Sequence, residues 1–472
     1  MVQNTDSHRP AFTSDILEHV AIDPETGFSL NPEFVDTIIL AIEDENTERL
    51  IELVHPLHAA DQAELLDRLN HDQRVVLTSA LKSDFDSEVL PELSAEAAED
   101  VLEALGAETS AQVLSELETD DAVHIIEDLT PADQKLILGQ MSADKRGEVE
   151  QSLSYPDESA GRLMRRNLVT VPMDWNVGNT IDYLRAHDDL PENFYVLYVT
   201  DDKFAPVGRI LLGVILHNKR DARIADIMND EIYAAHTHTD QEEVAFLFRK
   251  YALVETPVID NSGMLVGTIT VDDVVDVIKE EDDEDYHRAG GVSSQDISSR
   301  LITTVRARFS WLFINLITAI LASLVIGLFA KSIEQIVALA ILMPIVASMG
   351  GNAGTQSVTV AVRAIATRYL TENNSRSFVI KETLIGLING LALGGVMGVG
   401  TYFWFHDDVL ASVMFLAAVG TLTMAGLWGA LIPILIHRYR GDPAISSGIF
   451  LTTVTDCVGF FTFLGLATLI LL

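Results

Sequence analysis

An aspartate lies inside the last long apolar stretch of this sequence. Asp456 stands in TTVTDCVGF, after Thr452, Thr453 and Thr455 and one helical turn before Gly459. An ionised carboxylate in hydrocarbon is costly unless a cation pairs with it, and no basic residue follows position 440. A permeating cation is therefore the natural counter-ion. The alternative is a protonated, packed aspartic acid.

A second polar segment interrupts another apolar stretch. MPIVASMGGNAGTQS holds Pro344 and three glycines, and it brings Asn352, Thr355 and Gln356 to membrane depth. Proline and glycine loosen a helix, and freed carbonyls are tolerated there only when they are buried in protein or line a watery cavity. We expect this span to be tilted or broken and to form part of a pore or substrate site.

Five apolar stretches are long enough to cross a membrane. They cover residues 311–329, 333–362, 378–405, 409–436 and 443–472. Arginine and lysine gather before the first, between the second and third, and between the fourth and fifth stretches. The positive-inside rule predicts a multi-pass protein of the inner (plasma) membrane, with a cytoplasmic N-terminus and the C-terminus outside.

Glycines recur every fourth residue in the third stretch. Gly386, Gly390, Gly394 and Gly398 share one helix face, which lets another helix approach closely. Plain helix packing explains such a stripe.

The rest of the chain is strongly acidic. Of the 70 acidic and 31 basic residues, 63 and 21 fall in residues 1–299, which gives that part a net charge of −42. Phosphate contacts need clustered Lys and Arg, so nucleic acid is not expected as a partner. Cations, a salty cytoplasm or plain solubility each account for such acidity. The single cysteine excludes an internal disulfide and a cysteine-based metal site.

A twelve-residue repeat begins this acidic part. An apolar residue recurs at Leu57, Leu69, Leu81, Leu93, Leu105, Leu117, Leu129, Met141 and Leu153. Apolar residues precede each of them, as in EDVLEAL, and helix-start signals such as LTPADQK fall between. One short helix per unit cannot bury its apolar face alone, so the units should stack into a superhelical array.

Residues from about 162 to 285 change to a strand-like period. TPVIDNSGMLVGTITVDDVVDVI reads as strand, turn, strand and a helix opened by Thr270, and PENFYVLYVTDDKFAPVGRILLGVIL is a weaker echo. Two such halves form a pair with a cleft. Asp273 could hold a ribose hydroxyl there, while Gly213 and Val214 stand at the matching positions of the first half. A purely structural pair is the alternative.

Six consecutive acids, residues 280–285, follow this pair. Such a run repels itself and would be ordered by divalent cations or by a basic surface. The next segment, to about residue 308, has apolar spacing suited to a helix over the membrane entrance.

This order of modules resembles the MgtE family of magnesium channels, from about residue 35 onward. The most specific motifs are PIVASMGGNAGTQS and GDPAISSGIFLTTVTDCVGFF, whereas TPVIDNSGMLVGTITVDD is a CBS signature shared by many proteins. The resemblance implies a multidomain fold: an all-α superhelical N-terminal domain, an α/β tandem CBS pair, a connecting plug helix and five transmembrane helices. The expected bounds are a tail (1–34), the helical domain (35–158), the CBS pair (162–285, halves 162–224 and 225–285), the plug helix (290–308) and the membrane domain (309–472).

The resemblance also implies how these parts work. The family forms a homodimer in the lipid bilayer, with the pore on the two-fold axis, and Mg2+ is both substrate and regulator. The implied pore residues are Asp456, Asn352, Gln356 and Thr452. The implied Mg2+-sensing acids are Asp273, Asp276, Glu281, Glu284 and Asp285. ATP in the CBS cleft modulates some members, which makes Thr270 and Asp273 its candidate ligands.

The chain departs from the family at Ile449, where a proline is common, and at Gly213 and Val214. At most one nucleotide site per pair is therefore expected.

The leading hypothesis is a Mg2+-selective channel for influx, closed by cytosolic Mg2+, and not an enzyme. A channel for Co2+ or Ni2+ and a CBS-containing sensor without transport remain alternatives. An intramembrane aspartyl hydrolase is disfavoured because Asp442 and Asp456 lie about 21 Å apart along a helix and could not share a water.

Overall fold

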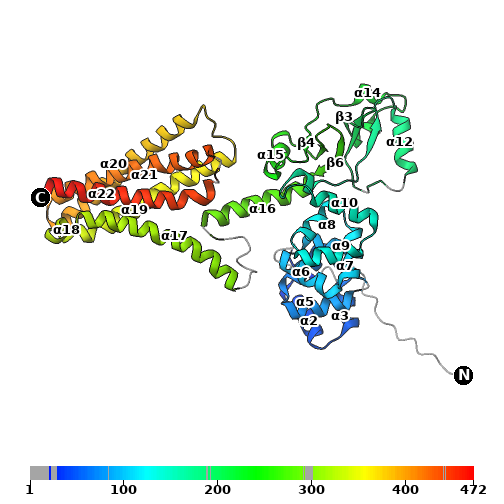
Figure 1. The fold of residues 1–472 in the computed structure, drawn as a ribbon, viewed down its shortest axis with the longest axis horizontal. Helices are drawn as coiled ribbons and strands as arrows, with labels where there is room; N and C mark the ends of the chain where they lie inside the picture. Colours follow the sequence, from blue (N-terminus) through cyan, green and yellow to red (C-terminus); the bar gives the residue numbers. More distant parts are fainter. Residues whose placement is uncertain are drawn as a thin grey trace. The chain divides into compact units, whose positions relative to one another are not determined.

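The computed structural model describes residues 21–22, 29–82, 84–187, 190–191, 193–290, 292, 301–439, 441 and 443–472. The chain divides into two compact units, Met1–Lys279 and Glu280–Leu472, with the boundary inside the helix α16 (Val271–Gly290) (Figure 1). Most of the expected tail, residues 1–34, lies outside the described residues, and the first long helix begins at Pro32.

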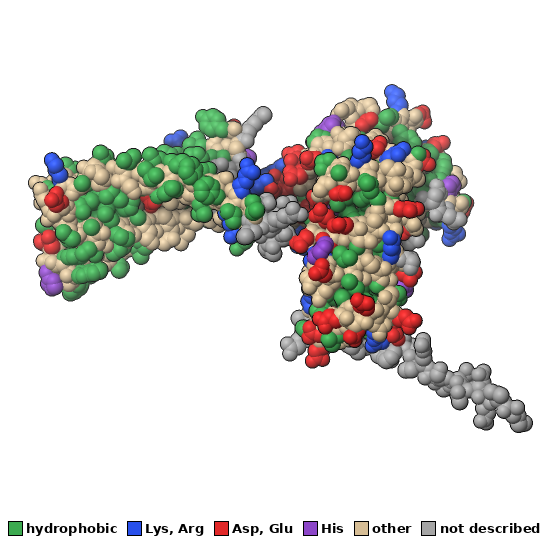
Figure 2. Space-filling model, turned by 60° about the horizontal axis from the view of Figure 1, so that its bottom comes forward, with side chains coloured by type: hydrophobic (Ala, Val, Ile, Leu, Met, Phe, Trp, Pro, Cys, Tyr) green, Lys and Arg blue, Asp and Glu red, His purple; other side chains and the backbone are tan. Residues whose placement is uncertain are grey.

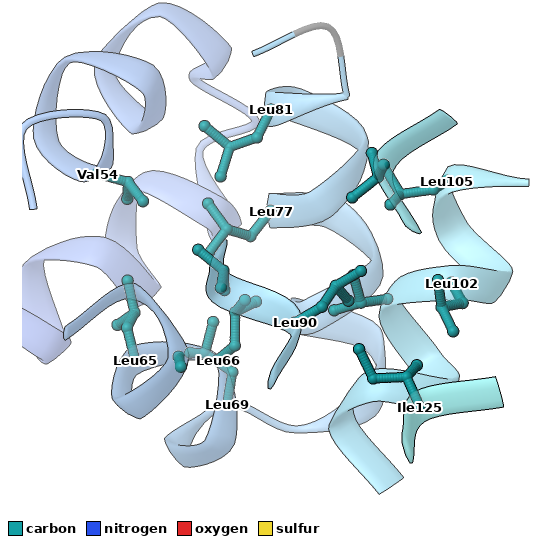
Figure 3. Packing of buried hydrophobic residues seen from close by; sticks show 14 of the residues in the cluster. Val54, Leu65, Leu66, Leu69, Leu77, Leu81, Leu90, Leu102, Leu105 and Ile125 are labelled. Carbon is teal, nitrogen blue, oxygen red and sulfur yellow. The ribbon is translucent and has the colours of Figure 1, made fainter. Parts of the chain in front are cut away.

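The first unit begins with a stack of short helices, as the repeat predicts. They are α2 (Pro32–Glu43), α3 (Thr47–Val54), α4 (Ala59–Arg68), α5 (His71–Leu81), the 3-10 helix η1 (Ser87–Glu92), α6 (Ala95–Leu105), α7 (Ala107–Glu116), α8 (Thr119–Glu127), α9 (Pro131–Gln140) and α10 (Ala143–Leu153). Each unit from α4 onward places its repeat residue at or just after the end of its helix. Leu69, Leu81 and Leu105 are buried in the shared core (Figure 3).

Polar caps fix where these helices start. Asn70 and Gln73 form a reciprocal capping box at the start of α5. Thr130 caps α9 by accepting a hydrogen bond from the backbone of Asp133, and Pro131 follows at the first helical position. The helix-start signal LTPADQK is therefore confirmed.

The second part of this unit holds two equivalent three-stranded sheets. Its elements are α11 (Ala160–Leu163), β1 (Thr170–Pro172), α12 (Val177–Ala186), β2 (Val196–Thr200), β3 (Pro206–Leu211), α13 (Leu212–His217), α14 (Ile224–Ile227), β4 (Ala235–His236), α15 (Gln241–Tyr251), β5 (Glu255–Ile259), β6 (Leu265–Thr270) and α16 (Val271–Gly290). The sheet orders are β1-β2-β3 and β4-β5-β6, each with one parallel and one antiparallel pairing. The pseudo-symmetric pair of halves is confirmed.

The segment that precedes the first strand of each half forms backbone hydrogen bonds with the last strand of the other half. Arg165, which precedes β1, pairs with Thr268 of β6, and Asn229, which precedes β4, pairs with Arg209 of β3. A glycine admits each crossing: a Cβ at Gly267 would lie 2.7 Å from the carbonyl oxygen of Arg165. The crossing therefore brings Arg165 to the end of β6, beside the start of α16.

The second unit contains α17 (Leu301–Leu328), α18 (Ala330–Gln335), α19 (Ala338–Ala366), α20 (Ser375–Phe405), α21 (Asp408–Arg438) and α22 (Pro443–Leu471). Within the described residues, five helices are long and apolar enough to cross a membrane. Figure 2 shows hydrophobic side chains over the visible flank of this unit and many acidic side chains on the Met1–Lys279 unit. The five predicted spans are confirmed.

The sequence predicts that this span is tilted or broken at GGNAGTQ, and the predicted break is wrong. Helix α19 runs without interruption from Ala338 to Ala366 and contains Pro344, and the chain breaks earlier, between α18 and α19. The glycines serve close packing instead. A Cβ at Gly350 would lie 2.7 Å from Cγ2 of Thr421, and one at Gly354 would lie 2.8 Å from Cδ1 of Leu451.

The expected plug helix, residues 290–308, is described in part. Residues 291 and 293–300 lie outside the described residues, and residues 301–308 are the first turns of α17.

Candidate functional site

Asp456 and Thr452 share one face of α22. Their neighbours Leu451 and Thr455 are buried; Leu451 faces Gly354 of α19, and Thr455 lies on the side of Gly350. Thr452 and Asp456 each follow one of these buried residues by one position, which is a rotation of about 100° around the helix. Their face of α22 is therefore turned away from the contact between α22 and α19. Thr452 is exposed and Asp456 is half-buried on this single chain.

Asn352 and Gln356 lie on a different face of α19. Gly350 and Gly354 face the neighbouring helices. Asn352 and Gln356 each come two residues later, a rotation of about 200° around the helix, so they lie on nearly the opposite side. Both polar side chains are exposed on the single chain. Thr452 and Asp456 thus lie on one face of α22, and among the described residues no hydrogen bond joins Asn352 or Gln356 to them.

A second intramembrane carboxylate lies at Glu382 of α20. Its side chain is 7% exposed, and its Oε2 accepts a hydrogen bond of 2.8 Å from Oγ of Ser357 in α19. Ser357 is one residue after Gln356, on the buried side of the helix. The sequence reasoning missed Glu382, although a glutamate inside the stretch 378–405 gives the same signal as Asp456.

The Met1–Lys279 unit has a cluster of acids around one arginine. Nε of Arg165 donates to Oδ2 of Asp120 in α8 at 3.0 Å. Its NH2 group donates to Oδ1 of Asp273 at 2.6 Å and to Oδ2 of Asp272 at 2.9 Å, both at the start of α16. This guanidinium is one of the contacts between the helical domain and the CBS pair, together with the ion pair of Arg162 with Glu127.

Burial shapes the acidity of this cluster. Burial raises the pKa of Asp120 well above its ordinary value, reinforced by repulsion from Asp273 and opposed by Arg165. Burial and the charge of Asp273 raise the pKa of Asp121 to about 6. Burial also raises the pKa of Asp273, against the pull of Arg165. Oδ1 of Asp120 is buried and has no hydrogen-bond partner among the described residues.

Asp273 already uses both carboxylate oxygens. Oδ2 accepts from the hydroxyl of Thr270 at 2.6 Å and from its backbone N–H at 3.2 Å, while Oδ1 accepts from Arg165. The Thr270–Asp273 motif therefore caps α16 here. In the first half, Gly213 and Val214 occupy the corresponding positions of α13, which follows β3 as α16 follows β6.

The other expected sensing acids follow along α16. Asp276 is exposed, whereas Glu281, Glu284 and Asp285 are half-buried, and Glu284 forms an ion pair with Arg288. Across the described part of the chain, no three His, Cys, Asp or Glu side chains converge as a metal site would need.

The sequence reasoning also missed Arg165 and Asp120. An available signal was the basic pair Arg165–Arg166 within a strongly acidic region. Asp120 gave no signal, because it is one of many acids on the helical repeat.

Three family models match parts of the chain. A family model described as a divalent cation transporter matches residues 343–466, the MgtE intracellular N domain matches residues 57–158, and the CBS domain matches residues 224–280.

Two curated relatives each match more than two thirds of the chain. The magnesium transporter MgtE of Thermus thermophilus is 35% identical over 329 residues, which are 69% of this chain and 73% of that protein. The magnesium transporter MgtE of Enterococcus faecalis is 32% identical, over 69% of this chain and 72% of that protein.

A solved structure of the cytosolic domain of the Mg2+ channel MgtE in complex with ATP is 31% identical. It covers 52% of this chain and 99% of its own, with a TM-score of 0.48. On its matches to the family model and to these relatives, the chain belongs to the MgtE family of divalent cation transporters, which are not enzymes.

Proposed function

We propose that this protein is a Mg2+-selective channel for magnesium influx, closed when cytosolic Mg2+ binds its acidic helical and CBS domains. Asp456 carries the proposal. A half-exposed carboxylate in the middle of an apolar helix, beside the exposed hydroxyl of Thr452, would face lipid unless another surface covers it. The magnesium transporters related to this chain support Mg2+ as the substrate.

A homodimer supplies the missing surface. If two copies meet on a two-fold axis, their Asp456 carboxylates face one another and repel unless a cation lies between them. Mg2+ keeps its water shell tightly, so two carboxylates can select it through bound water. Asn352 and Gln356, exposed on the single chain, would complete the polar lining in the dimer.

The membrane potential sets the direction in which Mg2+ moves, and the acids of α16 provide the signal that closes the channel. A membrane potential that is negative inside favours inward movement of a cation by about 2.3 kcal/mol per charge per 100 mV, and we place the N-terminus in the cytoplasm and the C-terminus outside. Cytosolic Mg2+ would then bind the acids of α16, namely Asp273, Asp276, Glu281, Glu284 and Asp285. Bound cations remove the repulsion between acidic surfaces and stabilise the closed state.

ATP at Thr270 and Asp273 stays a proposal of its own. Because Asp273 is paired with Arg165, a ribose hydroxyl would have to replace the guanidinium as its partner.

The test is Mg2+ entry into liposomes that contain the full chain and an internal magnesium dye. We expect uptake by the wild type at low internal Mg2+, inhibition by high internal Mg2+, and loss of uptake in Asp456→Asn. The matched control is Asp408→Asn, which neutralises an exposed carboxylate at the start of α21 and should leave uptake unchanged.

Three outcomes would contradict parts of the proposal. Unchanged uptake in Asp456→Asn would make this residue a packing group. Uptake of Co2+ or Ni2+ in preference to Mg2+ would support the other-divalent channel. No uptake by a folded wild type would favour a sensor without transport.

A further inference from the structure

We infer that Arg165 is a built-in cation that holds the helical domain on the CBS pair, so that this docking does not wait for a divalent cation. The guanidinium bridges Asp120 of α8 to Asp272 and Asp273 of α16, at 2.6–3.0 Å. A divalent cation can enter between these carboxylates only when Arg165 leaves.

The occupancy of the carboxylate oxygens supports this exclusion. Asp120 and Asp273 have four oxygens between them, and Arg165 and Thr270 take three. The fourth, Oδ1 of Asp120, is buried without a partner among the described residues. Mg2+ requires about six oxygen ligands at about 2.1 Å, whereas a planar guanidinium can satisfy two or three carboxylates through its fixed N–H groups.

The position of Arg165 follows from the crossing of the two halves. Its backbone pairs with Thr268 of β6, with N–H···O distances of 2.8 and 2.9 Å in the two directions. Its side chain is only 17% exposed. Because hydrogen bonds fix the backbone of Arg165 and its side chain is largely buried, little conformational entropy of this side chain remains to be lost when its charge is held at the interface.

The neighbouring arginine offers a matched comparison. Arg166 also reaches the helical domain, but there it donates to two neutral acceptors, Oε1 of Gln151 at 2.9 Å and Oγ of Ser152 at 3.4 Å. If docking depended merely on a long polar side chain in this segment, the two arginines would be equivalent. If it depends on charge among carboxylates, Arg165 matters and Arg166 does not; Arg162, which pairs with Glu127 of α8, is unchanged in both variants.

The inference rests on the proposed function in one respect, since Asp273 is among the acids proposed to sense Mg2+. It refines that proposal in two ways. The helical domain stays docked on the CBS pair at this cluster with or without Mg2+, and Mg2+ is sensed by the acids further along α16.

The test measures docking directly in the full-length chain in lipid nanodiscs. Spin labels are placed on Glu43→Cys in the helical domain and Lys203→Cys in the CBS pair, both exposed positions, in a Cys457→Ser background that removes the single native cysteine. Pulsed electron paramagnetic resonance then gives the distribution of distances between the two spin labels, in EDTA and in millimolar Mg2+.

We expect one narrow distribution in both conditions for wild type and for Arg166→Gln. Arg165→Gln should give a broader and longer distribution in EDTA that narrows when Mg2+ is added. Arg165→Lys, which keeps the charge but loses the planar fork, should fall between them.

Three results would overturn the inference. The first is a wild type that is broad in EDTA, because docking would then wait for a divalent cation. The second is an Arg165→Gln variant as narrow as wild type in EDTA. The third is a variant that stays broad in Mg2+, because a divalent cation is expected to replace the guanidinium. Magnesium uptake is measured separately, so loss of transport would contradict the proposed function without changing these distances.

Discussion

The hydroxyl of Ser357 in α19 donates a hydrogen bond to Oε2 of Glu382 in α20, at 2.8 Å. Helix α21 covers both residues closely. A Cβ at Gly426 would lie 2.5 Å from the carbonyl oxygen of Glu382, and one at Gly429 would lie 2.7 Å from Cβ of Ser357. The pair therefore ties the helix that carries Asn352 and Gln356 to two helices behind it.

Glu382→Ala should destabilise the membrane unit and reduce Mg2+ uptake. The substitution leaves the buried hydroxyl of Ser357 without this acceptor and opens a gap beneath α21, at a cost of about 1–3 kcal/mol. Glu382→Gln keeps the shape and an acceptor oxygen, so it should retain most of the stability and uptake. Thermal unfolding in detergent and liposome uptake measure the two effects.

Glu372→Ala is the control, because that acid is exposed before the start of α20. Equal effects of Glu382→Ala and Glu372→Ala would mean that the Ser357–Glu382 hydrogen bond does not support the membrane unit.

Gly386→Ala should lower the melting temperature, whereas Gly395→Ala should not. A Cβ at Gly386 would clash with the backbone oxygen of Leu422, which cannot move without shifting α21. Overpacking of this kind costs about 1–3 kcal/mol. At Gly395 in the same helix, nothing among the described residues lies within 4 Å of the added Cβ. Similar melting temperatures for the two variants would show that α20 and α21 do not pack this tightly.

Thr421→Val should stabilise the membrane unit. The hydroxyl of Thr421 is buried with no hydrogen-bond partner in the described part of the chain, while its methyl group packs toward Gly350 and Gly459. Valine keeps the shape and removes an unsatisfied polar group, a gain of about 1 kcal/mol. Thr423→Val, which loses the 2.7 Å bond from its hydroxyl to the carbonyl of Val419, should give no gain. Calorimetry in detergent compares them, and a gain from Thr423→Val alone would contradict the assignment.

Periodic features of the fold could be predicted from the sequence. The spacing from Leu57 to Leu153 predicts one helix per unit because each helix must bury the same apolar position. The uninterrupted α19 could not be predicted in this way. Glycine loosens a helix in isolation, but Gly350 and Gly354 are held by close contact with Thr421 and Leu451, and a sequence pattern does not show such a neighbour.

The site residues also differ in whether the sequence indicates them. Asp456 is evident from the sequence because a charge in an apolar stretch needs a counter-ion. The ion pair between Arg165 and Asp273 joins residues 108 positions apart. It exists because the segment before β1 crosses to β6, and local propensity carries no information about that crossing.

A buried glutamate joins the two CBS halves and makes their stability depend on pH. Glu255 of β5 is 3% exposed. Its Oε1 accepts from the hydroxyl of Thr268 at 2.9 Å, and its Oε2 accepts from the backbone N–H of Val196 in β2 at 3.2 Å. Burial raises the pKa of Glu255 above its ordinary value of 4.5, although these hydrogen bonds oppose the shift.

The sign of the pH dependence follows from this raised pKa. The folded state binds the proton of Glu255 more tightly than the unfolded state does, so the linked stability is fully present below pH 4.5 and is lost as the pH rises through the folded value. The melting temperature of wild type relative to Glu255→Gln should therefore fall as the pH rises from about 4 toward 7. Glu92→Gln, at an exposed glutamate, should run parallel to wild type. Calorimetry of the full chain across this range measures both differences, and a Glu255→Gln curve parallel to wild type would mean that this carboxyl titrates alike in both states.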